Sequence, residues 1–161
     1  MSETTDSTRD VATVERFIAA PAAKIFDLLA DPSRHQEIDG SGTVKGTVKS
    51  TTAGSQRLTL GSKFGMSMKM GIGYSMENTV VEFEEDALIA WQPRPSMPLM
   101  GLLIGGRIWR YELQPQKGGT LVRESWDISQ ERLPFAVRSM RSRTVDAMTK
   151  TLDRIAQQVE K

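Results

Sequence analysis

The sequence predicts an α+β fold in which a long C-terminal helix lies on a curved antiparallel sheet of about seven strands. Two observations predict it. Roughly ninety residues in the middle of the chain alternate short strand-like runs with turn residues. Residues 134–161 instead place apolar side chains three and four positions apart, which puts them on one face of a helix. A helix with one apolar face must bury it, so we expect it to cross the sheet and to leave a cavity there.

The chain opens with a predicted strand and two short helices. Val11–Ile18 mixes β-branched and charged residues, which is typical of a strand. Pro21–Ala30 is expected to be helical, and it ends at Asp31 because the residue before a proline leaves the α region. Residues 33–39 predict a further helical turn, and the glycines in 40–42 predict a flexible junction.

The middle of the chain supplies the other strands. Lys63–Met70 shows the clearest alternation, with three methionines and a phenylalanine on one face. Residues 71–73 are expected to form the hairpin turn that follows it. The remaining predicted strands are Thr43–Ser50, Gln56–Leu60, Tyr74–Glu84, Ala87–Gln92, Ile108–Gln114 and Thr120–Ser129.

The C-terminal segment predicts one continuous helix. Pro134 suits its first turn, and neither glycine nor proline follows to interrupt it before Lys161. About 25 helical residues would reach roughly 37 Å, enough to cross a small sheet.

The composition limits the number of domains and excludes several kinds of binding site. The 161 residues fit one domain over residues 11–161, after a polar and acidic tail over 1–10 that we expect to be disordered. With 21 basic and 20 acidic residues the net charge is +1, which argues against binding to a nucleic-acid backbone. The absence of cysteine excludes disulfides, thiolate nucleophiles and zinc–thiolate sites.

Targeting features are also missing from the sequence. Residues 1–10 lack the basic end and apolar run of a signal peptide, so a cytoplasmic location is expected. The longest apolar stretch, Pro98–Gly106, is far shorter than the roughly 20 residues that span a bilayer. We therefore expect no integral membrane association.

Several short motifs in the same order resemble one family. They are Ala20-Pro21 before 24–29, Asp31-Pro32, 81–84 before 89–91, 109–113 and 118–120. Together they resemble the START-related (SRPBCC) superfamily, which includes polyketide cyclase/dehydrase-like proteins and the birch-pollen allergen fold. The resemblance implies a helix-grip fold that encloses a pocket for an apolar ligand. It implies functions from lipid binding to ring-closing catalysis, with no shared catalytic motif to carry over.

Methionines and aromatic residues are the candidate ligand contacts. Thioethers adapt to irregular shapes, and large rings supply flat apolar walls with one polar handle. Ordinary core packing is the alternative for each residue, and for Trp109 a structural role competes directly with ligand contact. The candidates are Met66, Met68, Met70, Tyr74, Met76, Trp109, Tyr111, Trp126, Met140 and Met148.

The connection from Arg94 to Arg107 is a candidate lid. It is too apolar to be a solvated loop, and it carries glycines that can act as hinges. The alternatives are a homodimer surface, a short core-filling helix or shallow contact with a membrane surface. The apolar residues of this lid are Met97, Leu99, Met100, Leu102 and Leu103.

Three polar residues are candidates for catalysis. Glu124 has the parity of the inward residues of its strand, and Arg107 or Arg110 is a conceivable partner. Tyr111 could orient a ligand, and His35, the only histidine, could act as a base near a pocket mouth if it is not simply solvated. No metal-ligand spacing or phosphate-binding loop is present, so no metal or cofactor is expected.

These observations favour binding or transport of a small hydrophobic molecule, such as a lipid, polyketide or aromatic metabolite. The first alternative is a cofactor-free enzyme of the cyclase or dehydratase type. The second is a protein-interaction module that uses the segment from Met97 to Ile104.

Overall fold

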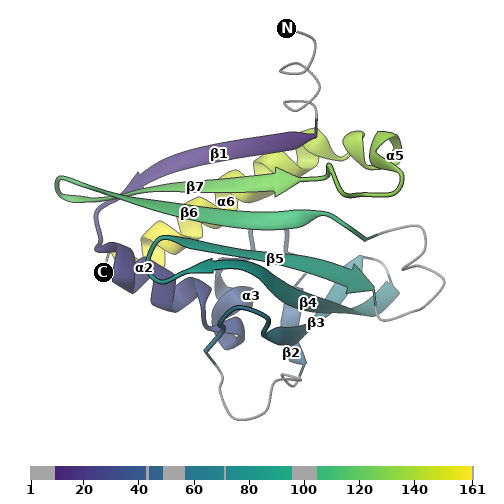
Figure 1. Cartoon of the computed structure of the whole chain (residues 1–161), viewed down its shortest axis with the longest axis horizontal. Helices are drawn as coiled ribbons and strands as arrows, with labels where there is room; N and C mark the ends of the chain where they lie inside the picture. The colour runs from purple at the N-terminus through teal and green to yellow at the C-terminus, as the bar shows by residue number, and fades with distance from the viewer. Residues whose placement is uncertain (1–9, 43, 49–56, 71, 96–104, 161) are drawn as a thin grey trace, which may run out of the picture.

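The computed structural model describes residues 10–42, 44–48, 57–70, 72–95 and 105–160 (Figure 1). The elements in chain order are β1 (Val11–Ile18), α2 (Ala22–Leu29), the 3-10 turn η1 (Pro32–Arg34), α3 (His35–Ile38), β2 (Val44–Val48), β3 (Lys63–Met70), β4 (Ile72–Glu84), β5 (Leu88–Pro95), β6 (Ile108–Gln116), β7 (Gly119–Asp127), α5 (Pro134–Arg138) and α6 (Arg141–Val159).

Within this described part, seven strands form one antiparallel sheet in the order β1-β7-β6-β5-β4-β3-β2. The first two strands therefore lie at opposite edges, and α2, η1 and α3 connect them. Helix α6 runs behind the sheet in Figure 1 and contacts β1, β7, α2 and α3. The predicted α+β architecture, with two short helices after the first strand, is confirmed.

Two predicted elements in the middle of the chain are wrong. No strand forms over residues 57–60. Instead the Leu58 amide donates to the Ala30 carbonyl at 2.8 Å, and its side chain is buried in the core. The predicted hairpin turn over 71–73 is also too long, because Ile72 already pairs with Met70 as part of β4. Gly71 itself lies outside the described residues.

The C-terminal helix is broken in two, whereas one continuous helix was expected. Ser139 and Met140 form a turn between α5 and α6. The Ser139 hydroxyl donates to the Ala136 carbonyl at 3.1 Å, and Arg138 forms an ion pair with Asp10 at 2.9 Å. The ion pair links α5 to the residue before β1, and α6 is the part of this segment that lies across the sheet.

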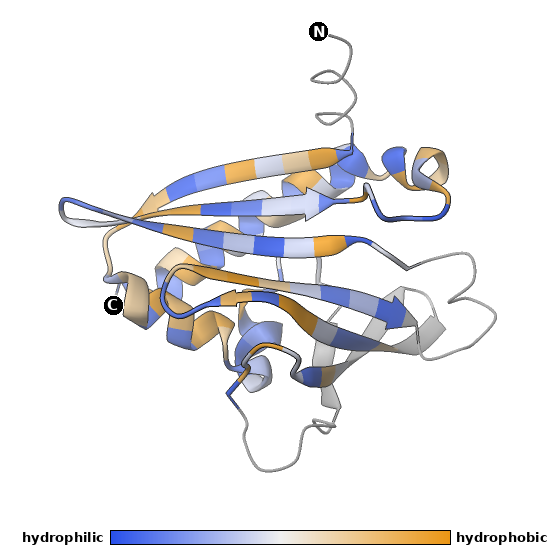
Figure 2. Cartoon of the chain, in the orientation of Figure 1, coloured by the Kyte–Doolittle hydropathy of each residue, from blue (hydrophilic) through white to orange (hydrophobic). Residues whose placement is uncertain are grey.

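The two faces of the sheet differ in chemistry, as Figure 2 shows by the alternating bands along the strands. On β6 and β7, Tyr111 and Val122 are buried beneath α6, while Arg123 points outward and forms an ion pair with Glu15 at 2.6 Å. Period-two alternation in the sequence therefore predicts the inner face of these strands correctly.

Two core clusters lie under α6. The larger joins α2 and the C-terminal half of α6 to the sheet, with Phe26, Ile89 and Ile155 among its members. The smaller gathers Trp126 and Met148 near α5. Both clusters contribute side chains to the cavity described next.

Candidate ligand-binding site

A cavity of about 560 Å³ lies between α6 and the inner face of the sheet. Strands β4, β5, β6 and β7 supply its walls. Helix α3 and the residues that follow it close one side, and α6 covers the cavity. Thr144, Ala147 and Met148 line it from α6. The exposed side chains of Arg143 and Lys150 also border it, so the cavity opens to solvent beside α6.

Gly40 lets α3 approach α6 closely at one side of this cavity. A Cβ atom at Gly40 would lie 2.1 Å from the Ala147 carbonyl oxygen, which no side chain could tolerate. The Gly40 amide donates to Thr151 Oγ1 at 2.9 Å. The predicted flexible junction over 40–42 is therefore, at Gly40, a tight packing contact.

Aromatic rings form one wall of the cavity. His35 stacks on Trp91 with the ring centroids 4.9 Å apart and an interplanar angle of 20°. Trp91 also lies 5.4 Å from the ring of Tyr111. Phe64 meets both His35 and Trp91 edge-on and holds them from behind. This wall favours ligands with flat apolar surfaces.

Glu124 is buried at the end of that wall. It faces Tyr111 directly across the β6–β7 pair, and the Tyr111 hydroxyl donates to Glu124 Oε1 at 2.9 Å. Only 2% of Glu124 is exposed, and its Oε2 atom has no partner among the described residues. Burial, reinforced by the negative charge of Asp39, raises the pKa of Glu124 to about 8, although the Tyr111 hydrogen bond opposes the rise.

Neither expected arginine pairs with Glu124. Arg107 bonds to Glu131 at 3.0 Å, and Arg110 bonds to Glu82 at 2.6 Å on the outer face of the sheet. Burial raises the pKa of Tyr111 well above its ordinary value, so its hydroxyl remains a donor. A neutral partner is consistent with a carboxyl group that stays protonated near neutral pH.

His35 is buried rather than solvated, with 4% of its surface exposed. Its Nε2 atom lies 2.8 Å from the Leu29 carbonyl oxygen. Its Nδ1 atom has no partner among the described residues. Burial lowers the pKa of His35 below its ordinary value, so the ring is neutral in this environment.

With this geometry established, the sequence matches over residues 9–160 the family described as polyketide cyclase / dehydrase and lipid transport. The chain belongs to this family. The predicted resemblance to polyketide cyclase/dehydrase-like SRPBCC proteins is thereby confirmed.

Two solved structures share the fold of this family member. A protein from Mycobacterium smegmatis, Ms6760, superposes with a TM-score of 0.69 at 15% identity, covering 94% of this chain and 92% of that one. The di-domain ARO/CYC StfQ from the steffimycin biosynthetic pathway superposes with a TM-score of 0.65 at 13% identity, covering 98% of this chain and 53% of that one.

A closer sequence relative is the uncharacterized protein Rv0088 of Mycobacterium tuberculosis. It is 40% identical over 98 residues, which are 60% of this chain and 38% of that protein. The chain thus matches well under half the length of this curated relative.

The structure brings half of the predicted ligand contacts to the cavity. Trp126 is buried in the smaller core cluster and is not among the lining residues. The side chains of Met66, Met68, Met70 and Tyr74, and the predicted lid residues Met97, Leu99, Met100, Leu102 and Leu103, lie outside the described residues. The predicted contacts that line the cavity are Met76, Trp109, Tyr111, Met140 and Met148.

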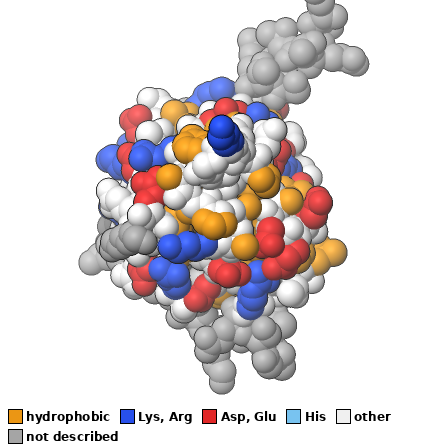
Figure 3. Space-filling model, turned by 90° about the vertical axis from the view of Figure 1, so that its left-hand side faces the viewer, with side chains coloured by type: hydrophobic (Ala, Val, Ile, Leu, Met, Phe, Trp, Pro, Cys, Tyr) orange, Lys and Arg blue, Asp and Glu red, His pale blue; other side chains and the backbone are white. Residues whose placement is uncertain are grey.

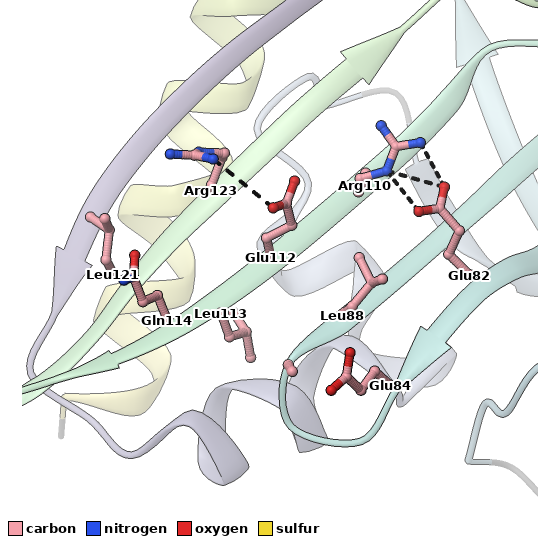
Figure 4. A pocket seen from close by; sticks show the side chains of 10 residues that line it. Glu82, Glu84, Leu88, Arg110, Glu112, Leu113, Gln114, Leu121 and Arg123 are labelled. Atoms are coloured by element: carbon pink, nitrogen blue, oxygen red, sulfur yellow. Dashed lines mark hydrogen bonds and ion pairs between the residues drawn. The ribbon is translucent and has the colours of Figure 1, made fainter.

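A second hollow, of about 610 Å³, lies on the outer face of the sheet (Figure 4). Charged side chains line it and largely neutralise one another. Arg110 binds Glu82 with three hydrogen bonds, and Arg123 lies 4.0 Å from Glu112. None of the polar side chains that line this open hollow is buried, so the cavity beneath α6 is the candidate site.

At the end of the molecule drawn in Figure 3, acidic and basic side chains are interspersed. The described surface on this face therefore has no large patch of a single charge sign. Among the described residues, no cluster of three or more histidines or carboxylates could hold a metal ion. No helix in the same residues is long and apolar enough to cross a membrane.

Proposed function

We propose that this chain binds a small, mostly apolar molecule in the cavity beneath α6. One observation carries the proposal: the cavity has aromatic and methionine walls, yet it keeps a buried carboxyl group, Glu124, with an unpartnered oxygen. Ligand pockets typically combine a large apolar surface with a few polar groups that orient the ligand. The family description, which includes lipid transport, supports the proposal.

Blocking the cavity tests this proposal. Thr144 is buried on the face of α6 that lines the cavity, whereas Thr149 is exposed on the same helix. Thr144→Phe would fill part of the cavity, and Thr149→Phe is the matched control. Protein purified from its own host is examined by native mass spectrometry, and the bound molecule is extracted into solvent and identified.

The expected result is a bound apolar molecule in the wild type and in Thr149→Phe, and its loss from Thr144→Phe. Matched thermal unfolding of both variants shows whether the fold is kept. A bound apolar molecule that is retained by a folded Thr144→Phe protein would contradict binding at this site.

Catalysis is the second candidate function, and the pKa of Glu124 favours it. A carboxyl group with a pKa of about 8 exchanges its proton near neutral pH, as a general acid or base must. Glu124 would move a proton while the aromatic wall holds the substrate in a folded shape. This corresponds to a cofactor-free cyclase or dehydratase.

Glu124→Gln separates the two functions. A carrier with this change should keep its affinity for the extracted molecule, because glutamine preserves the shape and the hydrogen bond from Tyr111. An enzyme should still bind that molecule but convert it at least about a hundredfold more slowly. Conversion at the wild-type rate would rule out Glu124 as the acid or base.

A further inference from the structure

Two buried polar atoms in the cavity wall lack partners, and they have opposite hydrogen-bonding character. They are Glu124 Oε2 and His35 Nδ1, and both residues line the cavity. A buried polar atom without a partner destabilises the unliganded protein, because burial removes its hydrogen bonds to water. A ligand that supplied both partners would remove this destabilisation on binding.

The position of the proton on His35 and on Glu124 follows from the hydrogen bond that the other polar atom of the same side chain makes. The Leu29 carbonyl can only accept, so His35 Nε2 carries the hydrogen and Nδ1 is left as an acceptor. The Tyr111 hydroxyl donates to Glu124 Oε1, so the acid proton of a neutral Glu124 lies on Oε2, which becomes a donor. The raised pKa of Glu124 and the lowered pKa of His35 agree with both neutral forms.

Building on the proposed function, we propose that the ligand is a neutral, flat molecule with a hydrogen-bond acceptor at one end and a donor at the other. A phenolic or hydroxylated ketone is of this class. Its carbonyl oxygen accepts from Glu124 Oε2, and its hydroxyl donates to His35 Nδ1.

The aromatic wall sets the spacing between the two ends. The ring of Trp91 lies between His35 and Tyr111, in contact with both. Tyr111 in turn is bonded to Glu124. Two successive ring contacts, of 4.9 and 5.4 Å between centroids, therefore separate His35 from the residue that is bonded to Glu124. The two polar groups of the ligand must lie at opposite ends of a scaffold such as a fused two-ring aromatic, and not on adjacent atoms of a short chain.

Four matched naphthalenes test the proposal on the wild-type protein by titration calorimetry at pH 6.5. The first carries an acetyl group and a hydroxyl at opposite ends of the ring system. The second has the hydroxyl replaced by methoxy, the third has the acetyl replaced by ethyl, and the fourth has both changes. We expect each replacement to weaken binding about tenfold, because each leaves one buried atom unpaired again.

The outcomes separate this inference from the proposed function. Equal affinity for all four probes would overturn the inference, while leaving the cavity as an apolar binding site. Failure of all four to bind would also overturn the inference, whereas a bound apolar molecule that is lost from Thr144→Phe would still support the proposed function. A preference for a negatively charged probe, with a carboxylate in place of the acetyl group, would also overturn the inference.

Variants assign each preference to its residue. Glu124→Gln keeps a donor toward the ligand and an acceptor toward Tyr111, so the preference for acetyl over ethyl should persist; Glu124→Leu should abolish it. His35→Phe keeps the ring stacked on Trp91 and should abolish only the preference for hydroxyl over methoxy. Loss of the wrong preference in a folded variant would overturn the assignment. The wild-type comparison stands if a variant does not fold.

Discussion

The Tyr111 hydroxyl donates a 2.9 Å hydrogen bond to Glu124 across the β6–β7 pair, where the two residues face each other in register. This bond holds a carboxyl group that lines the cavity and whose other oxygen is buried with no partner among the described residues. Because ionisation in that setting is costly, the pKa of Glu124 rises to about 8. The chemistry of the site depends on this pair.

Tyr111→Phe should raise the pKa of Glu124 further. Of the described groups that act on Glu124, the Tyr111 hydroxyl is the one that lowers its pKa, since its hydrogen bond favours the charged carboxylate. Carbon-13 NMR of the labelled glutamate carboxyl groups follows the titration directly, with Glu124→Gln identifying the signal. A pKa that stays the same or falls in the variant would show that the bond does not act on Glu124.

As the pH rises, the free energy of unfolding of the wild type should fall relative to that of Glu124→Gln. The folded pKa of about 8 lies above the ordinary value of 4.5, so the folded state holds a proton that the unfolded state has released. The stabilising contribution is therefore complete below pH 4.5 and is lost as the pH rises through 8. His35 is present in both proteins, so its opposite contribution cancels in the comparison.

Urea unfolding from pH 5 to 9 measures this difference. We expect it to change by at most about 1.4 kcal/mol per pH unit and to level off above pH 8. A constant difference across that range would mean that Glu124 titrates with an ordinary pKa in the folded protein.

Gly40→Ala should destabilise the fold by about 3 kcal/mol, since α3 and α6 must separate to admit the methyl group. Gly42→Ala is the matched control. Gly42 has a φ of +71° but open space around its Cβ position, so its substitution should cost only about 1 kcal/mol of backbone strain. Free energies of unfolding from urea titration compare the two. Equal costs would contradict the tight contact at Gly40.

Glu131→Gln should cost about 3 kcal/mol of stability. The Glu131 side chain is fully buried, and it accepts hydrogen bonds from the Arg107 guanidinium and from the amides of Gly105 and Arg107. Neutralising it leaves the largely buried Arg107 charge without its counter-charge. Glu15→Gln, which removes the exposed partner of Arg123, should cost much less, because solvent screens this pair. Thermal unfolding orders the two variants, and a larger loss in Glu15→Gln would contradict this account.

The fold was largely predictable from the sequence because periodicity reports burial. β1 and β3 have the predicted bounds, and alternation along β7 correctly placed Glu124 inside. The break at Ser139 was not predictable, since no glycine or proline marks it and the ion pair beside it joins Arg138 to the distant Asp10.

The site was harder to predict because its partners are distant in sequence. Tyr111 and Glu124 were both candidates, but their bond depends on the β6–β7 register, which sequence parity alone does not set. His35 follows a proline turn among polar residues, so its sequence neighbours indicate a solvated side chain. The side chains that pack against it are Phe64 on β3 and Trp91 on β5.

Methionine-methyl NMR tests the central claim, binding in the cavity beneath α6, most directly. Met76, Met140 and Met148 line this cavity, and single Met→Leu variants assign their signals. Titration with the acetyl- and hydroxyl-bearing naphthalene should shift these three signals, and the shifts should be absent in Thr144→Phe. Shifts of Met66, Met68 and Met70 would extend the site along β3. Unchanged signals from Met76, Met140 and Met148 on saturation with the probe would contradict the account.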